Sequence, residues 1–179
     1  LAEKGMLAVG CALLAIMLYI WFRFEWQFSI AAILALSHDV ISTIGLFSLT
    51  SFEFNLATVA AILTIAGYSI NDTVVVFDRV RENLRRYKSY EQRDILNKSL
   101  NETLSRTVMT SVTTLLALLA IVIFGGAVLR DFALAMMWGV IIGTYSSVFV
   151  AVGMLAKFDL KRTEEDEEDG AAGDQGSTS

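Results

Sequence analysis

The sequence contains no proline, one cysteine and one histidine in 179 residues. Because proline is absent, no helix of this chain is kinked by a residue that lacks a backbone N–H. The single cysteine, Cys11, excludes a disulfide within the chain and a cysteine-based metal site. A lone imidazole, that of His38, cannot hold a metal ion by itself. The sequence therefore predicts no metal site.

Charged residues are also scarce, at 18% of the chain, whereas hydrophobic residues make up 55% and the mean hydropathy is +0.57. This apolar content is typical of a membrane protein. The net charge of −5 arises near the C-terminus, since eight of the nineteen acidic residues lie between Asp159 and Asp174. Such a segment cannot bury apolar surface, so residues 159–179 are expected to form a disordered acidic tail. Without it, charges nearly balance, and nothing indicates a nucleic-acid partner.

Five apolar stretches approach or exceed the roughly 20 residues with which a helix crosses a bilayer. They span residues 5–22, 27–49, 55–78, 107–124 and 131–157. Most connections between them contain only a few residues, so consecutive helices are expected to pack as antiparallel neighbours. The sequence therefore predicts an all-α membrane protein, a five-helix transmembrane bundle in which only residues 79–106 form a substantial connection.

Basic residues are distributed unevenly between the two ends of this bundle. The connection at residues 79–106 carries eight of the fourteen, which places it in the cytoplasm. Alternation of the helices then puts the C-terminus in the cytoplasm and residues 1–4 on the periplasmic side. Apolar residues recur at helical spacing in the connection, which predicts a helix along the membrane surface with its bases towards lipid headgroups. They are Ile95, Leu96, Leu100, Leu104 and Val108.

Two aspartates fall within the predicted spans, Asp39 near the middle of the second and Asp72 in the cytoplasmic half of the third. An ionised aspartate at a helix centre costs about 2.5 to 3.5 kcal/mol on insertion scales, so both are candidate functional residues. His38 is expected to point to a different helix face from Asp39 and to be a polar packing residue. Serine and threonine hydroxyls gather at similar depths and need one another, water or an ion. We therefore expect a hydrated internal pocket shared by four helices.

Arginines at the cytoplasmic edge could supply basic partners for this pocket. Arg106 opens the fourth span and can reach inward, whereas Arg79 lies two turns after Asp72 on nearly the same face and Arg81 is rotated away. An approaching guanidinium changes the affinity of a carboxyl for a proton, so its movement can load or release one. The pattern suits a proton relay, but it also fits a static buried ion pair that only fixes helix packing.

Small residues recur every four positions along the fifth predicted span, which favours close contact with a neighbouring helix. They are Gly139, Gly143, Ser147 and Ala151. Gly67, on the third span, is expected to share this packing role.

The longest distinctive stretch runs from Gly67 to Asn83, with Gly-Tyr-Ser-Ile-Asn-Asp-Thr at its start and Asp-Arg-Val-Arg-Glu-Asn at its end. Further distinctive stretches are Leu36–Val40, Arg106–Thr107 with the threonine-rich helix after it, Phe124–Gly126 and Gly143–Ser147. Together they resemble the signatures of the SecF family of bacterial membrane proteins. The resemblance covers about residues 5–158, which are therefore expected to form one transmembrane domain.

The resemblance implies an RND-like fold and a function in protein export. Members of the family work with SecD beside the Sec translocon, which contains SecY, SecE and SecG, and the expected partners also include YajC, membrane lipids and the unfolded preprotein. They lie in the inner membrane and draw preproteins across it with the proton gradient, so protons are the coupling ion and no other cofactor is expected. By position, Asp72 matches the proton-carrying acid of the family, Arg106 its relay arginine and Arg81 a functionally implicated arginine. Asp39 also matches a position of the family, and it is a further candidate residue of the proton relay.

Members of the family have six spans and a folded periplasmic domain between the first two. This sequence contains no counterpart of the first span or of that domain, and it begins with Leu1 instead of Met. Both features favour a cut in a longer protein.

Two other functions are alternatives to proton-driven export. Intramembrane aspartyl proteases also carry two aspartates on neighbouring helices, but their Tyr-Asp and Gly-x-Gly-Asp motifs differ from His38-Asp39 and Asn71-Asp72, so no enzyme activity is expected. The alternative that stays open is a structural scaffold of the translocon assembly without proton conduction. A scaffold would tolerate loss of the Asp72 carboxyl and would fail after changes at Gly139 and Gly143.

Overall fold

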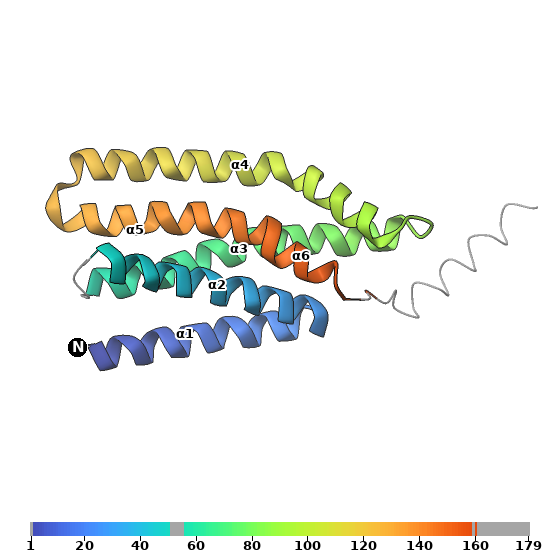
Figure 1. Ribbon diagram of the computed structural model, residues 1–179, viewed down its shortest axis with the longest axis horizontal. Coiled ribbons are helices and arrows are strands. Elements are labelled where there is room, and N and C mark those ends of the chain that lie inside the picture. Colours follow the sequence, from blue (N-terminus) through green and yellow to red (C-terminus); the bar gives the residue numbers. More distant parts are fainter. Residues whose placement is uncertain (1, 51–55, 159, 161–179) are drawn as a thin grey trace, which may run out of the picture.

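The computed structural model describes residues 2–50, 56–158 and 160, and this part of the chain is helical with no strand (Figure 1). The elements are α1 (Ala2–Arg23), α2 (Trp26–Thr50), α3 (Leu56–Arg86), α4 (Gln92–Phe124), α5 (Gly126–Tyr145), the π-helix η1 (Ser146–Ala151) and α6 (Val152–Leu155). The predicted all-α membrane bundle is confirmed. The predicted acidic tail, apart from Leu160, lies outside the described residues.

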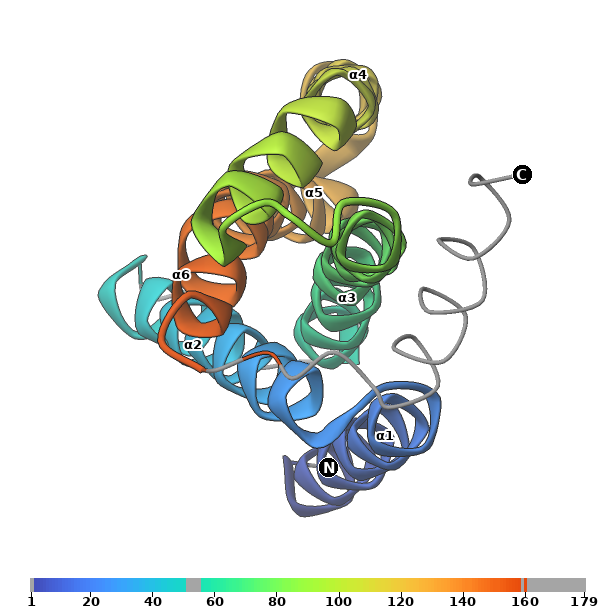
Figure 2. The same ribbon diagram turned by 90° about the vertical axis from the view of Figure 1, so that its right-hand side faces the viewer.

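Successive long helices run antiparallel along one axis, as the short connections predict (Figure 1). Seen end-on, α5 packs against α2, α3 and α4, whereas α1 lies at the edge of the bundle against α2 and α3 (Figure 2). Four helical stretches are long and apolar enough to cross a membrane, namely Trp26–Thr50, Leu56–Arg86, Gln92–Phe124 and Leu129–Leu155. The apolar helix within α1, Leu7–Arg23, is shorter.

The connection between the third and fourth long helices differs from the expectation. Residues 79–86 prolong α3 and residues 92–106 belong to α4, so only residues 87–91 join the two helices. Arginine, glutamate, lysine and leucine have good helix propensity, and backbone hydrogen bonding continues where the apolar sequence stops. Ile95 and Leu96 are buried in the bundle. The amide of Gln92 donates to the carbonyls of Leu155 and Phe158, at 3.1 and 2.8 Å, and fixes the start of α4 against the end of α6.

Two buried apolar clusters hold the helices together. Near the α3–α4 connection, the rings of Phe24, Phe28 and Phe77 meet with centroids 5.3–6.2 Å apart. Towards the other end, Ile65 of α3 packs with Leu118 of α4 and with residues of α5. These clusters fix α3 between its neighbours, and α3 is the helix that carries Asp72.

The fifth long helix is irregular, although it contains no proline. α5 continues into the π-helix η1 and then into α6, and together they cover most of the single helix predicted at residues 131–157. A π-helix closes its hydrogen bonds over five residues, so it widens the turn and displaces the side chains that follow. This irregularity places Ser146 and Ser147, both buried, among the residues of the candidate site.

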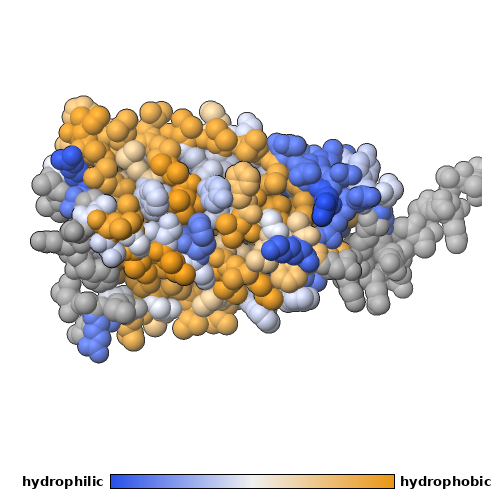
Figure 3. All heavy atoms as spheres, viewed as in Figure 1, coloured by the Kyte–Doolittle hydropathy of each residue, from blue (hydrophilic) through white to orange (hydrophobic). Residues whose placement is uncertain are grey.

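Polarity is segregated along the bundle. Hydrophilic residues gather at the end where α3 meets α4, and apolar residues cover most of the remaining visible face (Figure 3). The C-terminal ends of α1 and α6 lie at this same polar end of the bundle (Figure 1).

Candidate functional site

Two buried aspartates on neighbouring helices form the centre of the candidate site. The residue Asp39 of α2 is 0% exposed and Asp72 of α3 is 5% exposed. Burial of a carboxyl in an apolar bundle is costly unless hydrogen bonds or an opposite charge compensate for it. The surroundings of the two aspartates differ in this respect.

The Asp39 carboxyl is a hydrogen-bonded junction of three elements. Its Oδ2 accepts hydrogen bonds from the hydroxyl of Ser69 on α3 and, at 2.6 Å, from the hydroxyl of Ser146 on η1. Its Oδ1 lies 3.0 Å from Nδ1 of His38, whose side chain is 42% exposed. His38 and Asp39 thus lie on different helix faces, one exposed and one buried, as expected, but the imidazole folds back and contacts its neighbour.

The serine and threonine hydroxyls near the aspartates do not require the predicted hydrated pocket. Many donate to the carbonyl four residues earlier in their own helix, as Thr43 does to Asp39 at 2.7 Å and Thr144 does to Val140 at 2.8 Å. Such bonds satisfy a hydroxyl without water. The sequence reveals where the hydroxyls lie, but it does not show that the backbone satisfies them.

Other hydroxyls join neighbouring helices. Thr73 of α3 and Ser147 of η1 are 3.0 Å apart, and Ser111 of α4 and Thr144 of α5 are 2.7 Å apart. Together with the Asp39 junction, these pairs connect α2, α3, α4 and α5 through polar side chains.

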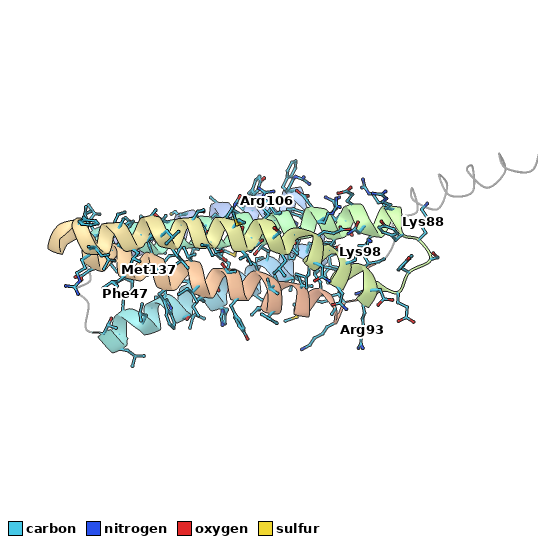
Figure 4. All side chains as sticks on the ribbon, turned by 90° about the horizontal axis from the view of Figure 1, so that it is seen from above. Phe47, Lys88, Arg93, Lys98, Arg106 and Met137 are labelled. Atoms are coloured by element: carbon cyan, nitrogen blue, oxygen red, sulfur yellow. The ribbon has the colours of Figure 1, made fainter. Side chains whose placement is uncertain are left out.

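Asp72 has a different environment from Asp39. Its Oδ2 is inaccessible to solvent and has no hydrogen-bond partner among the described residues. The basic group that interacts electrostatically with this carboxyl is Arg106 of α4, but the two side chains do not form an ion pair within 4.0 Å. Arg106 lies between the two ends of the bundle, whereas Lys88, Arg93 and Lys98 lie at the polar end (Figure 4). Asp72 and Arg106 therefore interact electrostatically but do not form a salt bridge.

The other two arginines of the sequence hypothesis are engaged elsewhere. Arg79 donates at 2.6 Å to Glu102 of α4 and at 2.6 Å to Glu82. The guanidinium of Arg81 lies over the Phe24 ring, 5.7 Å from its centroid, and faces the α1 side of the polar end. The structure therefore brings Arg81 to neither aspartate, because nine residues at about 100° each leave its direction about half a helical turn away from that of Asp72.

The three packing glycines do not behave alike. A Cβ at Gly139 would lie 2.2 Å from Cγ1 of Ile65, and a Cβ at Gly143 would lie 3.1 Å from Cβ of Ser69. Both glycines therefore allow α5 to approach α3 closely. Among the described residues, a Cβ at Gly67 would meet no heavy atom within 4 Å, so packing in this part of the chain does not require that glycine.

A polar cluster at the α3–α4 end was not foreseen from the sequence. Asn83 is 1% exposed, and its amide donates to Ser99 at 2.9 Å and to Glu102 at 2.8 Å. Glu102 also accepts from Arg79, and it lies four residues, about one helical turn, before Arg106. The one sequence signal was a polar residue at a position that continues the buried stripe of α3 through Val76 and Val80.

Within the described ranges, no three histidine, cysteine, aspartate or glutamate side chains lie together as metal ligands. The groups that the site presents are the carboxyl, hydroxyl and guanidinium groups of aspartate, serine and arginine side chains, which donate and accept hydrogen bonds.

The sequence matches the family described as "Protein export membrane protein SecD/SecF, C-terminal" over residues 1–161. It is 60% identical over 154 residues to the protein translocase subunit SecF of Rhodobacter capsulatus and 54% identical over 162 residues to that of Cereibacter sphaeroides. These alignments cover 86% and 90% of this chain, and 46% and 50% of the relatives. The chain thus spans about half the length of these curated relatives.

Solved structures show the same arrangement of helices. The crystal structure of SecDF, a translocon-associated membrane protein from Thermus thermophilus, superposes with a TM-score of 0.83 at 50% sequence identity. The match covers 87% of this chain and 22% of that one. The bundle therefore corresponds to one part of a larger membrane protein in that structure.

Proposed function

We propose a function for this chain from one premise: it belongs to the family of protein export membrane proteins SecD/SecF. Its relatives are translocase subunits, and the chain takes part in protein export as a non-enzymatic component of a multi-pass membrane protein. The finer proposal is that it couples the proton gradient to preprotein movement and that it does so together with SecD.

The observation that carries the proton proposal is the state of Asp72. A carboxyl that served only to fix helix packing would be expected to form hydrogen bonds or an ion pair, as Asp39 does with two serines. Asp72 is instead buried without a hydrogen bond, while Arg106 interacts with it from the neighbouring helix. This arrangement leaves the carboxyl free to change its protonation state when the distance to Arg106 changes.

Each residue of the proposed relay has a separate task. Asp72 takes up and releases the proton, and Arg106 stabilises the ionised form when the guanidinium approaches. Asp39 holds α3 at Ser69, one turn before Asp72, and so acts as a positioning residue. Arg81 lies at the cytoplasmic end of the same helix, where it contributes to the charge of the membrane surface.

Family membership also supports partners and a location. We propose that the chain lies in the bacterial inner membrane with its C-terminus in the cytoplasm, because α6 ends at the polar end of the bundle, where Lys88, Arg93 and Lys98 lie (Figure 4). SecD supplies the other half of a pseudo-symmetric bundle. The Sec translocon of SecY, SecE and SecG, with YajC, supplies the channel, and the unfolded preprotein is the substrate.

A chimera tests this proposal, because the chain spans half of its relatives. Residues 5–158 would replace the corresponding segment of the Rhodobacter capsulatus subunit, and preprotein export would be measured with and without a proton gradient. We expect the chimera to support gradient-dependent export and its Asp72→Asn variant to lose that dependence. The matched control is Asp131→Asn, which removes an exposed carboxyl at the start of α5.

The scaffold alternative makes the opposite prediction. Unchanged gradient-dependent export by Asp72→Asn, at normal protein levels, would show that the chain acts without proton exchange at this carboxyl. Loss of export in Asp131→Asn to the same degree would show that the chimera reports general instability.

A further inference from the structure

An open pocket of about 580 Å³ lies at the polar end, between the end of α1 and the last turns of α3. Its lining residues are all charged: Arg23, Asp78, Arg81, Glu82, Arg85 and Arg86. Four arginines against two acidic residues leave a net charge of +2. A pocket lined in this way attracts an anion.

The acidic residues do not neutralise the arginines evenly. Asp78 pairs with Arg23 at 3.2 Å, and the Glu82 carboxylate accepts a 2.6 Å hydrogen bond from Arg79, which is outside the pocket. Within the described part of the chain, Arg81 forms only a cation–π contact, with Phe24. Arg81 is therefore an arginine of the pocket with no acidic partner among the described residues.

The position of the pocket indicates the source of the anion. α1 ends at Arg23, directly after Trp21 and Phe22, whose residues are 61% and 94% exposed. Exposed aromatic residues followed by arginine are typical of the membrane–water interface, where lipid phosphates lie. Trp26, at the start of α2, is also 54% exposed. The pocket therefore opens at headgroup level, next to an apolar surface that lipid acyl chains can cover.

We propose that this pocket binds the phosphate group of an anionic phospholipid from the cytoplasmic leaflet. Guanidinium groups bind phosphate oxygens through paired hydrogen bonds, and the apolar surface of α1 accommodates the acyl chains. Neither protein export nor proton coupling requires this site, whereas the assignment to the cytoplasmic leaflet rests on the orientation given under the proposed function. A free phosphate offers the same chemistry without the acyl chains.

Lipid retention by the full chain, purified in detergent and analysed by native mass spectrometry, tests the proposal. The ligands are phosphatidylglycerol and, as the zwitterionic control, phosphatidylcholine with the same acyl chains. We expect phosphatidylglycerol to be retained preferentially. Each arginine near the surface contributes about 1 kcal/mol to binding of anionic lipid, so Arg23→Gln and Arg86→Gln should each weaken retention about fivefold. Arg93→Gln, at an exposed base outside the pocket, should not.

The variant Asp78→Asn distinguishes an effect on lipid binding from an effect on the stability of the fold. If the Arg23–Asp78 pair only stabilised the fold, Arg23→Gln and Asp78→Asn would act in the same direction. Because Asp78 reduces the positive charge of the pocket, the proposal expects Asp78→Asn to raise retention of phosphatidylglycerol while Arg23→Gln lowers it. Circular dichroism and size-exclusion elution would establish that each variant is folded.

Three results would overturn the proposal. Equal retention of the two lipids would show that the pocket does not select a headgroup, and displacement of phosphatidylglycerol by millimolar inorganic phosphate would assign it to a soluble anion. Replacement of the acidic side chains at residues 164–169 by amides offers the third test. If that change raised retention, the acidic segment of this chain would be the occupant instead of the lipid.

Discussion

The hydroxyl of Ser146 donates a 2.6 Å hydrogen bond to Oδ2 of Asp39, although 107 residues separate them in the sequence. Ser69 donates to the same oxygen. One carboxyl therefore fixes the π-helix and α3 against α2. Ser69 lies three residues before Asp72, so the junction at Asp39 also determines where the proposed proton-carrying side chain lies.

Removal of the Asp39 carboxyl should destabilise the protein. Asp39→Ala leaves the buried Ser69 hydroxyl without its acceptor, and a buried polar group without a partner costs about 1–3 kcal/mol. Thermal unfolding of the purified chain in detergent, followed by circular dichroism, would measure the loss as a lower midpoint temperature. Asp39→Asn keeps an acceptor oxygen at this position and should retain most of the stability.

The matched control for this change is Asp131→Ala, at an exposed aspartate, and it should leave the midpoint unchanged. An Asp39→Ala variant as stable as the unmodified chain would contradict the junction described above. Loss of export by Asp39→Asn without loss of stability would instead move Asp39 from a positioning residue to the relay.

Close packing at Gly139 leads to a second prediction. Gly139→Ala places a methyl group where Ile65 now lies, and overpacking of this kind costs about 1–3 kcal/mol. Ile65→Ala removes the clashing side chain, so the double variant should lose less stability than the sum of the two single variants. Thermal unfolding of the three variants would measure this coupling.

Gly67→Ala is the control for the same substitution in a helix. Its Cβ would meet nothing within 4 Å, and alanine has the better helix propensity, so stability should be unchanged or should rise by up to about 1 kcal/mol. Equal effects of Gly139→Ala and Gly67→Ala would contradict the distinction between the two glycines.

Much of this bundle could be predicted from the sequence because long apolar runs have few alternatives to a helix in a membrane. The two aspartates were recognisable because a carboxyl is costly in such a run. The contacts of Gly139 and Gly143 with α3 follow the four-residue spacing of small side chains. In each case, one strong physical constraint acts on a short stretch of sequence.

The remaining features depend on contacts that no short stretch contains. The π-helix at Ser146–Ala151 was not predictable from the absence of proline, because a π-helix needs no missing N–H. The role of Asp39 depends on Ser146, which is distant in the sequence. The helix predicted around Ile95 to Val108 is present but continues α4 instead of forming a separate surface helix, and the extension of α3 over residues 79–86 was not predicted, because the end of a hydrophobic run does not mark the end of a helix.

The buried amide of Asn83 gives a third prediction. Asn83→Ala removes the hydrogen bonds to Ser99 and Glu102 and should lower the free energy of unfolding by about 1–3 kcal/mol. Because Glu102 precedes Arg106 by about one helical turn, the chimera with this change should also show weaker gradient-dependent export. Asn97→Ala, at an exposed position of the same end, should affect neither measurement.

A double substitution separates these two effects. If the cluster positions Arg106, then Asn83→Ala should reduce export in the unmodified chimera but should have no further effect on export once Asp72 is replaced by Asn. A further loss of export in the double variant would show that Asn83 acts only through general stability.

The environment of Asp72 leads to a fourth prediction, in which stability and function change in opposite directions. The Asp72 carboxyl is buried without a hydrogen bond, so the neutral amide of Asp72→Asn removes the cost of burying a charge. We expect the unfolding midpoint to stay constant or to rise, by an amount equivalent to at most about 2 kcal/mol. The same change should abolish gradient-dependent export by the chimera.

Replacement of a residue that is retained for structure lowers the stability of the protein, as predicted for Asp39→Ala. Replacement of a relay residue should impair only export. A lower midpoint for Asp72→Asn would therefore identify this carboxyl as a packing group and would remove the main support for proton exchange at this site.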